Sequence, residues 1–426
     1  MAAADLLLSE GVGTFFAVTA LCTASVGFML QFSTLVVVCL ALVAVIFMVF
    51  VWCALAASCE TIWELPRTIL DIQLAVVRTV LGIASRGFRP RFPQWTLRFE
   101  VARAVMSAMR QGRSAQNIVT ARNAQYFRQQ INLVGTMKAT AACQEFGTMV
   151  NPLNMNEMEH LWVRSKRDMR SKTRLVVLYF HGGGYVHFGP RFYVELANRL
   201  RAGILTKLQQ LDANQAENVT VEVLLANYRK SPEHQFPVPQ QDALSMYKYL
   251  IEREGIPANH IIVAGDSAGG GLAISTLLRI RDETSLPQPA AAVLICPMAD
   301  LADDPSADKA RDRHCILTVP MLRAFIHAFH PTPADPKTWK DAASAYCDLR
   351  GLPPAYIQTG MCDTIHQDSV KLYAKAQADG LTTWEYDAFE HMPHAFVIVP
   401  SKILPEADRG MDHAADFVAR HWVKQL

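Results

Sequence analysis

The segment Gly265–Gly269, which reads GDSAG, constrains the fold more than any other part of the sequence. It directly follows the apolar run IIVA at residues 261–264 and precedes a stretch of small residues typical of a closely packed helix. A chain that turns this sharply from strand to helix leaves no room for side chains beside the turn, which explains the flanking glycines. The segment therefore predicts a strained, exposed Ser267 at the turn, where the N-terminus of the next helix favours negative charge.

Apolar runs alternate with helical stretches from Ser171 onward. Runs such as VVLYF fit strands buried on both faces, and strands that alternate with helices predict a mostly parallel sheet covered by helices on both sides. The region 300–347 interrupts this pattern and is expected to form a cap insertion. The predicted strands are Leu175–Phe180, Val219–Ala226, Ile261–Ala264, Ala291–Cys296, Ala355–Thr359 and Thr383–Ala388. The predicted helices between them include Asp242–Glu254, Gly270–Arg281 and Asp368–Asp379.

Residues 1–59 are predicted to anchor the chain in a membrane. From Gly11 to Cys59 the sequence holds no Asp, Glu, Lys, Arg or His, and about 20 apolar residues span the hydrocarbon core of a bilayer. The run is long enough for two crossings, at 12–30 and 35–57, although the first segment could instead lie in the interface or belong to one tilted helix. A cleaved signal peptide is disfavoured because no basic residue precedes the run and the run is too long.

Residues 60–170 are predicted to form a helical linker and cap, because they contain few strand signals. Within them, the segment Trp95–Gln111 mixes apolar side chains with Arg98, Arg103 and Arg110. This pattern fits a basic helix on a membrane surface. It also fits a cap helix with its apolar side on the core, which we favour because any helix that covers a domain shows such a pattern. Residues 171–426 then form the α/β domain.

The net charge and the cysteine spacing give no sign of nucleic-acid binding, a metal centre or a disulfide framework. The formal net charge is +2, so nothing in the composition predicts nucleic-acid binding. The nine cysteines show no CxxC or Cys/His spacing, so neither a metal centre nor a disulfide framework is expected.

Two signals disagree about the side of the membrane on which the α/β domain lies. Between Thr61 and Arg113 there are nine arginines against three acidic residues, which favours a cytoplasmic position for this flank. The sequon Asn218-Val219-Thr220 precedes a predicted strand and suits a lumenal domain instead.

A glycine run, His181-Gly182-Gly183-Gly184, ends the predicted strand 175–180. Such a run leaves backbone N–H groups free to face a substrate oxygen, and the same motif class supplies the oxyanion hole of lipases and esterases. Together with the GDSAG turn, it predicts that the N–H groups of Gly182, Gly183 and Ala268 stabilise an oxyanion. We expect His181 to hold this loop and not to carry protons.

A serine nucleophile needs a base, and the base needs an orienting carboxylate. With a GxSxG turn, the chain order is Ser, then Asp or Glu, then His. Asp363 follows the predicted strand 355–359, at the strand end where such an acid belongs. The loop after the last predicted strand, FEHMPHAF, offers His391 and His394 as the base, and spacing alone does not choose between them.

The stretch 175–397 resembles the hormone-sensitive lipase family of α/β-hydrolases, and within it members similar to arylacetamide deacetylase and steryl acetate hydrolase. HGGGY, NYRKSPEHQFPVPQQDAL, VAGDSAGGGLA and the final HAF correspond to family blocks in the same order. The last family block has His followed two residues later by Phe, which selects His394 with Phe396, whereas His391 falls where the family often has glycine. The acid block departs from the usual Asp-Pro-Leu, since Asp363 begins DTI here.

The resemblance implies an α/β-hydrolase fold with a helical cap, and a serine ester hydrolase that forms an acyl-enzyme without a cofactor. Some family members carry an N-terminal anchor and face the lumen of the endoplasmic reticulum, which supports the lumenal side. A capped apolar pocket beside a lipid bilayer favours lipophilic esters, such as acetylated sterols or acylglycerols. The alternative is a ligand-binding receptor: the gibberellin receptors resemble this family but lack the catalytic histidine, whereas this chain keeps all three residues. The sequence sets no oligomeric state.

Overall fold

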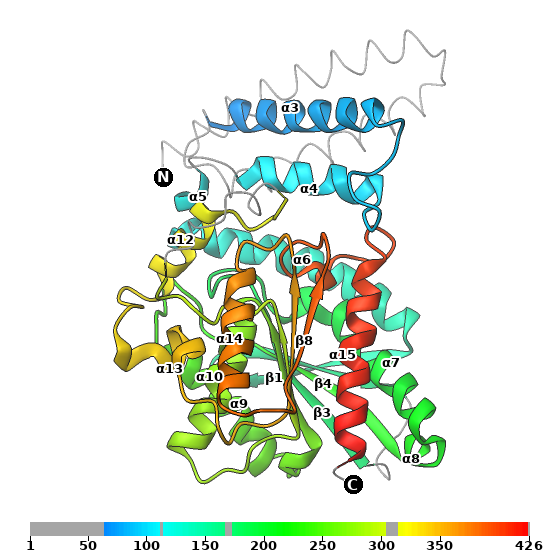
Figure 1. The fold of residues 1–426 in the computed structure, drawn as a ribbon, viewed down its shortest axis with the longest axis vertical. Helices are drawn as coiled ribbons and strands as arrows, with labels where there is room; N and C mark the ends of the chain where they lie inside the picture. The colour runs from blue at the N-terminus through cyan, green and yellow to red at the C-terminus, as the bar shows by residue number, and fades with distance from the viewer. Residues whose placement is uncertain (1–63, 111–113, 167–172, 304–313, 425–426) are drawn as a thin grey trace. The chain divides into compact units, whose positions relative to one another are not determined.

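The computed structural model describes residues 64–110, 114–166, 173–303 and 314–424. The predicted anchor, residues 1–59, lies outside the described residues, and so do both predicted crossings at 12–30 and 35–57. The described chain folds around one eight-stranded sheet with helices on both faces (Figure 1).

The sheet has the order β1-β2-β4-β3-β5-β6-β7-β8. Strands β4, β3, β5, β6, β7 and β8 run parallel to one another, and only the β1–β2 and β2–β4 pairs are antiparallel. The six strands predicted from the sequence are all present and form this parallel part. The strands are β1 (Thr148–Met155), β2 (Met158–Ser165), β3 (Thr173–Phe180), β4 (Val219–Ala226), β5 (Ile261–Asp266), β6 (Ala291–Ile295), β7 (Ala355–Gly360) and β8 (Glu385–Phe389).

Successive residues of β3 face opposite sides of the sheet, as the two-residue period of a strand requires. Val176, Leu178 and Phe180 enter one hydrophobic core, and the residues between them enter the other. One core is covered by α9 (Val238–Glu252), α10 (Ala268–Glu283) and α14 (His366–Ala378). The other is covered by α7 (Val194–Leu211) and α15 (Glu406–Val423), which also pack on each other. The short helix α8 (Ala213–Glu217) precedes β4.

Residues 148–165 differ from the helical structure expected for 60–170, because they form the hairpin of β1 and β2. The β1 strand contains Asn151, Pro152 and Asn154, and most of its residues are partly or fully exposed. Proline is tolerated in a strand that has a neighbour on one side only. Because an edge strand buries few side chains, β1 leaves no long apolar run in the sequence, and the buried part of β2 has only the short apolar run LWV.

The cap consists of two pieces, of which the first lies at one end of the sheet in Figure 1. The N-terminal piece consists of α3 (Glu64–Ser85), α4 (Leu97–Arg110), α5 (Ser114–Asn117) and α6 (Ala121–Glu145). The helix α4 buries Phe99 against Trp95 and the core, in agreement with the favoured cap-helix interpretation. The second piece lies within the predicted insertion 300–347 and contains α12 (Val319–Phe329) and α13 (Trp339–Ala342).

Helix α3 has an unusual surface for a helix of a folded domain. Its segment Pro66–Ser85 is 20 residues long and has a mean hydropathy of 1.5, so it is long and apolar enough to cross a membrane by length and composition alone. Only 6% of this segment is buried, and Leu70, Leu74, Val77 and Leu81 are all exposed. At 100° per residue these four side chains share one face of the helix.

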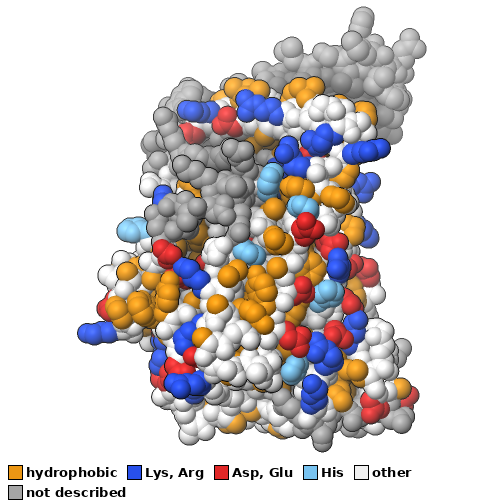
Figure 2. All heavy atoms as spheres, in the orientation of Figure 1, with side chains coloured by type: hydrophobic (Ala, Val, Ile, Leu, Met, Phe, Trp, Pro, Cys, Tyr) orange, Lys and Arg blue, Asp and Glu red, His pale blue; other side chains and the backbone are white. Residues whose placement is uncertain are grey.

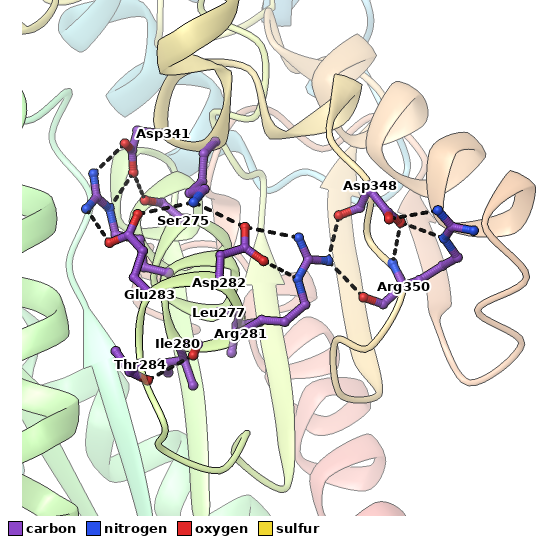
Figure 3. Close-up of polar contacts among 12 residues, drawn as sticks. Ser275, Leu277, Ile280, Arg281, Asp282, Glu283, Thr284, Asp341, Asp348 and Arg350 are labelled. Carbon is purple, nitrogen blue, oxygen red and sulfur yellow. Dashed lines mark hydrogen bonds and ion pairs between the residues drawn. The ribbon is translucent and has the colours of Figure 1, made fainter.

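Ion pairs tie α10 to the cap insertion (Figure 3). The buried carboxylate of Asp341 accepts hydrogen bonds from Arg279 at 2.6 and 2.8 Å and from the Ser275 hydroxyl. Further along the same helix, the Arg281 guanidinium donates to the carbonyl oxygens of Asp348 and Arg350, at 2.7 and 2.8 Å. Because α10 begins directly after Ser267, these contacts fix the insertion relative to the GDSAG turn.

Replacing Arg279 by Met should lower the free energy of unfolding by about 3 kcal/mol, because it leaves the buried Asp341 carboxylate without its cation. Urea unfolding of the purified full chain measures this change. The matched control is Arg350→Ala, which removes the ion pair between Arg350 and Asp348, whose side chains are 71% and 48% exposed. We expect no measurable change in the control, and equal losses in the two variants would contradict the assignment.

Candidate active site

The GDSAG turn places Ser267 directly between β5 and α10. Ser267 has φ 54° and ψ −122°, a conformation that L-residues rarely adopt and that strained turns at functional sites retain. The flanking glycines are required by space: a Cβ on Gly265 would lie 2.2 Å from the Gly269 oxygen, and a Cβ on Gly269 would lie 2.0 Å from the Phe180 oxygen. The predicted strand-to-helix turn is thus present, but Ser267 is only 6% exposed, so the expected exposure of the serine is wrong.

Ser267, His394 and Asp363 form a chain of hydrogen bonds. In the sequence, His394 lies 127 residues from Ser267 and 31 residues from Asp363. The Ser267 hydroxyl donates to His394 Nε2 at 2.7 Å, and His394 Nδ1–H donates to Asp363 Oδ2 at 2.9 Å. The three residues follow β5, β7 and β8, so each comes from the carboxyl end of a parallel strand. The structure therefore brings together the serine, acid and histidine selected from the sequence.

His391, the other histidine considered as the base, lies elsewhere. Its Nδ1–H donates to the side-chain oxygen of Gln94 at 3.0 Å, and its ring stacks on Phe92 with centroids 4.2 Å apart. These contacts turn it toward the segment between α3 and α4 and away from Ser267. The geometry accordingly selects His394 from the two candidates.

Two buried thiols flank the Asp363 carboxylate. The Cys315 thiol donates to Asp363 Oδ1 across 3.9 Å, and the Ile365 N–H donates to the same oxygen at 3.0 Å. Burial raises the pKa of Cys315 to about 12 and, together with Asp363, raises the pKa of Cys296 well above its usual value. Both side chains therefore remain neutral thiols beside the carboxylate. Cys315 belongs to the cap insertion, so the insertion contacts the acid directly.

A metal ion would compete with these hydrogen bonds. Within the described ranges, the group of donors close enough to share an ion is Cys296, Asp363 and His394, whose ligand atoms all lie within 4.8 Å of one another. Asp363 and His394 already bind each other, and Cys296 Sγ accepts the Ala395 N–H at 3.3 Å.

The structure of the glycine loop after β3 shows that one of the three predicted oxyanion donors, Gly182, is wrong. The Gly182 N–H donates to Asp266 Oδ1 at 3.0 Å and to the Tyr193 hydroxyl at 3.1 Å, so it is not free to bind a substrate oxygen. In the part of the chain that the structure describes, the N–H groups of Gly183, Gly184 and Ala268 have no acceptor. The sequence prediction included Gly183 and Ala268 and missed Gly184, which shares with Gly183 a positive φ.

Asp266 joins the serine turn to the glycine loop. Its buried carboxylate also accepts hydrogen bonds from the hydroxyl groups of Tyr179 and Tyr193, at 2.9 and 3.0 Å. Burial raises the pKa of Asp266 to about 6, although these hydrogen bonds oppose the shift. Asp266 therefore accepts the hydrogen bond that fixes Gly182, the first glycine of the loop. No sequence motif by itself predicts this role.

His181 supports the loop, as predicted. Its Nδ1 lies 2.8 Å from the Gly182 oxygen, its ring stacks on Tyr228, and the Tyr228 hydroxyl donates to the His181 carbonyl at 2.8 Å. Complete burial lowers the pKa of His181 to about 3, so the ring is neutral near pH 7.

Known proteins resemble this chain in sequence and in fold. The family model described as the alpha/beta hydrolase fold matches residues 177–398. The acetyl-hydrolase of Streptomyces hygroscopicus is 33% identical over 261 residues, which cover 60% of this chain and 78% of the relative.

Two solved structures share the fold. An esterase/lipase from an uncultured bacterium superposes with a TM-score of 0.62 at 26% identity, covering 76% of this chain and 99% of its own. An esterase from the bacterial hormone-sensitive lipase family has a TM-score of 0.57 at 21% identity, covering 82% and 98%. The family match over half of the chain and the 33% identical acetyl-hydrolase show that this chain belongs to the α/β-hydrolase family, as a carboxylic ester hydrolase.

Proposed function

We propose that this protein is a membrane-anchored serine esterase that hydrolyses lipophilic acetyl esters through an acyl-enzyme. The observation that carries the proposal is the hydrogen-bonded chain of Ser267, His394 and Asp363 at the carboxyl ends of the strands. A receptor that only binds a ligand has no need of this alignment, and the relatives are esterases, so the receptor alternative is not favoured.

In this mechanism His394 Nε2 takes the hydroxyl proton of Ser267 as the oxygen attacks the ester carbonyl. The resulting imidazolium is stabilised by the buried Asp363, whose other oxygen is held by the Ile365 N–H and the Cys315 thiol. His394 then donates the proton to the leaving alcohol, and water repeats the sequence on the acyl-enzyme with His394 again as the base.

We assign the N–H groups of Gly183, Gly184 and Ala268 as the donors that stabilise the tetrahedral oxyanion. Ala268 is the first residue of α10, so its N–H has no partner within the helix and lies at the positive end of the helix dipole. Gly184 adopts φ 63°, which glycine reaches at little cost. Donors that are fixed before the reaction stabilise charge without reorganising.

A short acyl group suits the glycine loop. The ring of Phe325 from α12 packs so close to Gly184 that a Cβ there would lie 2.4 Å from it. On the neighbouring residue, Tyr185 stacks on Phe329 with centroids 3.7 Å apart. The Phe325 ring from the cap insertion therefore packs directly against the glycine loop of the proposed oxyanion hole, which favours a small acyl group such as acetyl. The acetyl-hydrolase relative acts, by its name, on such a group. Acetylated sterols and acylglycerols are the substrates we propose.

Two features support attachment to a lipid bilayer. The sequence from Gly11 to Cys59 is free of charged residues and histidine. Helix α3, which begins five residues later, exposes the apolar face of Leu70, Leu74, Val77 and Leu81, and Figure 2 shows hydrophobic and charged side chains side by side along it. A helix with an exposed apolar face flanked by arginines suits the interface of a bilayer.

We further propose that the α/β domain faces the lumen of the endoplasmic reticulum. The support is the sequon at Asn218 together with the resemblance to lumenal family members. Asn218 is exposed at the start of β4, where a glycan would extend away from the sheet.

Ser267→Ala should lower the hydrolysis of a chromogenic acetate ester by at least about 10³-fold and abolish labelling by a fluorophosphonate, because the nucleophile is lost. Membranes carrying the full chain provide the assay, with decanoate and steryl acetate esters compared in parallel. The control is Ser245→Ala on α9, which should keep both activity and labelling. A folded wild-type protein that takes no label would contradict the proposal, and a preference for decanoate would contradict the assignment of an acetyl group.

Asp266→Ala should lower kcat by about 10²-fold, because the Gly182 N–H loses its acceptor and the neighbouring oxyanion donors shift. Asp266→Asn retains an oxygen acceptor and should stay within about 10-fold of the wild type. Steady-state kinetics on an acetate ester distinguish the two variants. Equal activity of both variants would show that the Asp266 oxygen does not hold the loop.

The wild-type chain expressed in eukaryotic cells should stay in the membrane pellet after carbonate extraction and should shift in mobility after endoglycosidase treatment. Asn218→Gln should remove the mobility shift and leave the pellet unchanged. Release into the supernatant would contradict the anchor. A wild-type chain without a glycan would contradict the lumenal side.

A further inference from the structure

The loop that carries His394 is held on one side by the chain segment between α3 and α4. Within this segment the indole N–H of Trp95 donates to the His391 carbonyl oxygen at 2.8 Å, across a sequence separation of 296 residues. The Trp95 side chain is 2% exposed, so this hydrogen bond is shielded from water.

Two neighbours of Trp95 hold the His391 ring. Gln94 accepts a hydrogen bond from His391 Nδ1–H at 3.0 Å, and Phe92 stacks on the imidazole with an interplanar angle of 14°. Phe92 also packs edge-on against Trp95 at 4.9 Å. The backbone and the side chain of His391 are thus both held by one short segment of the N-terminal cap, which we call the His-loop clamp (Phe92, Gln94 and Trp95).

The other side of the same loop is held by the chain segment that precedes Asp363. The carbonyl of Met392 accepts the Cys362 N–H at 2.9 Å, next to Asp363, and a Cβ on Gly360 would lie 2.2 Å from that carbonyl. His391 itself has φ 61°, a conformation that a non-glycine residue keeps only when its surroundings enforce it. The His-loop clamp contacts this strained residue three positions before His394.

We propose that Phe92, Gln94 and Trp95 are positioning residues that set the orientation of His394 through the backbone of His391. The proposal rests on the assignment of His394 as the catalytic base. It also gives a role to the second histidine of the loop, which serves as the docking point of the clamp. None of the three clamp residues is placed in contact with substrate, so they act on the chemical step and not on binding.

The clamp connects the base to the part of the chain nearest the anchor. The buried Glu100 on α4 accepts hydrogen bonds from the Arg86 guanidinium at 2.6 Å and from the Arg91 N–H at 3.0 Å. These contacts tie the first half of the connection between α3 and α4 to α4, and the clamp follows directly at residues 92–95. A displacement of α3 would therefore reach His394 through this connection.

Trp95→Phe tests the proposal, with Trp384→Phe as a matched control. Trp384 is also 2% exposed and donates its indole N–H to a backbone carbonyl, that of Pro353, at 3.0 Å. Both variants lose one buried hydrogen bond and a similar ring volume, so similar losses of thermal stability are expected. We expect Trp95→Phe to lower kcat about 10-fold with an unchanged KM, because a small misorientation of the base slows the chemical step. Trp384→Phe should keep the wild-type kcat.

A second pair of variants keeps the test decisive if Trp95→Phe does not fold. Gln94→Leu removes the acceptor of His391 Nδ1–H and should lower kcat several-fold, and Gln94→Glu restores an oxygen acceptor and should recover it. Equal kcat values for the two tryptophan variants, or for the two Gln94 variants, would overturn the proposal. If Ser267→Ala instead keeps the activity of the wild type, the proposed function is overturned. Failure of the clamp proposal and failure of the proposed function are therefore distinguishable.

Discussion

The buried carboxylate of Asp266 is the interaction on which the geometry of the site depends. It precedes Ser267 in the chain and binds the Gly182 N–H and the hydroxyl groups of Tyr179 and Tyr193. Burial makes the charged form costly, as the raised pKa of about 6 indicates, and three donors offset that cost. One side chain thereby holds the serine turn and the glycine loop in register, so nucleophile and oxyanion donors are positioned as a unit.

Much of this architecture could be predicted from the sequence, for identifiable reasons. Five of the six parallel strands, β3 to β7, are buried on both faces and leave largely apolar runs, whereas the edge strand β8 is mostly half-buried. Ser267 could be predicted because its turn excludes side chains at Gly265 and Gly269. The hairpin of β1 and β2 could not, because an edge strand with Pro152 and two asparagines carries no such run.

The donors of the glycine loop could also be predicted only in part. Three consecutive glycines look equivalent in the sequence, and only the tertiary partner of the first one, Asp266, excludes Gly182 as a donor. Likewise, spacing alone could not separate His391 from His394, because they lie three residues apart in one loop. Their different roles come from contacts with Gln94 and Asp363, which are distant in the chain.

The contact between Trp95 and His391 has a consequence for the order in which the protein becomes active. Its partners are 296 residues apart, so the contact forms only after both segments have been made. A ribosome releases the N-terminal cap long before it makes the loop that carries His394, and domains fold as their residues emerge. The nascent chain therefore holds a serine turn without a base until the loop of His394 has been made, so hydrolysis cannot precede that step.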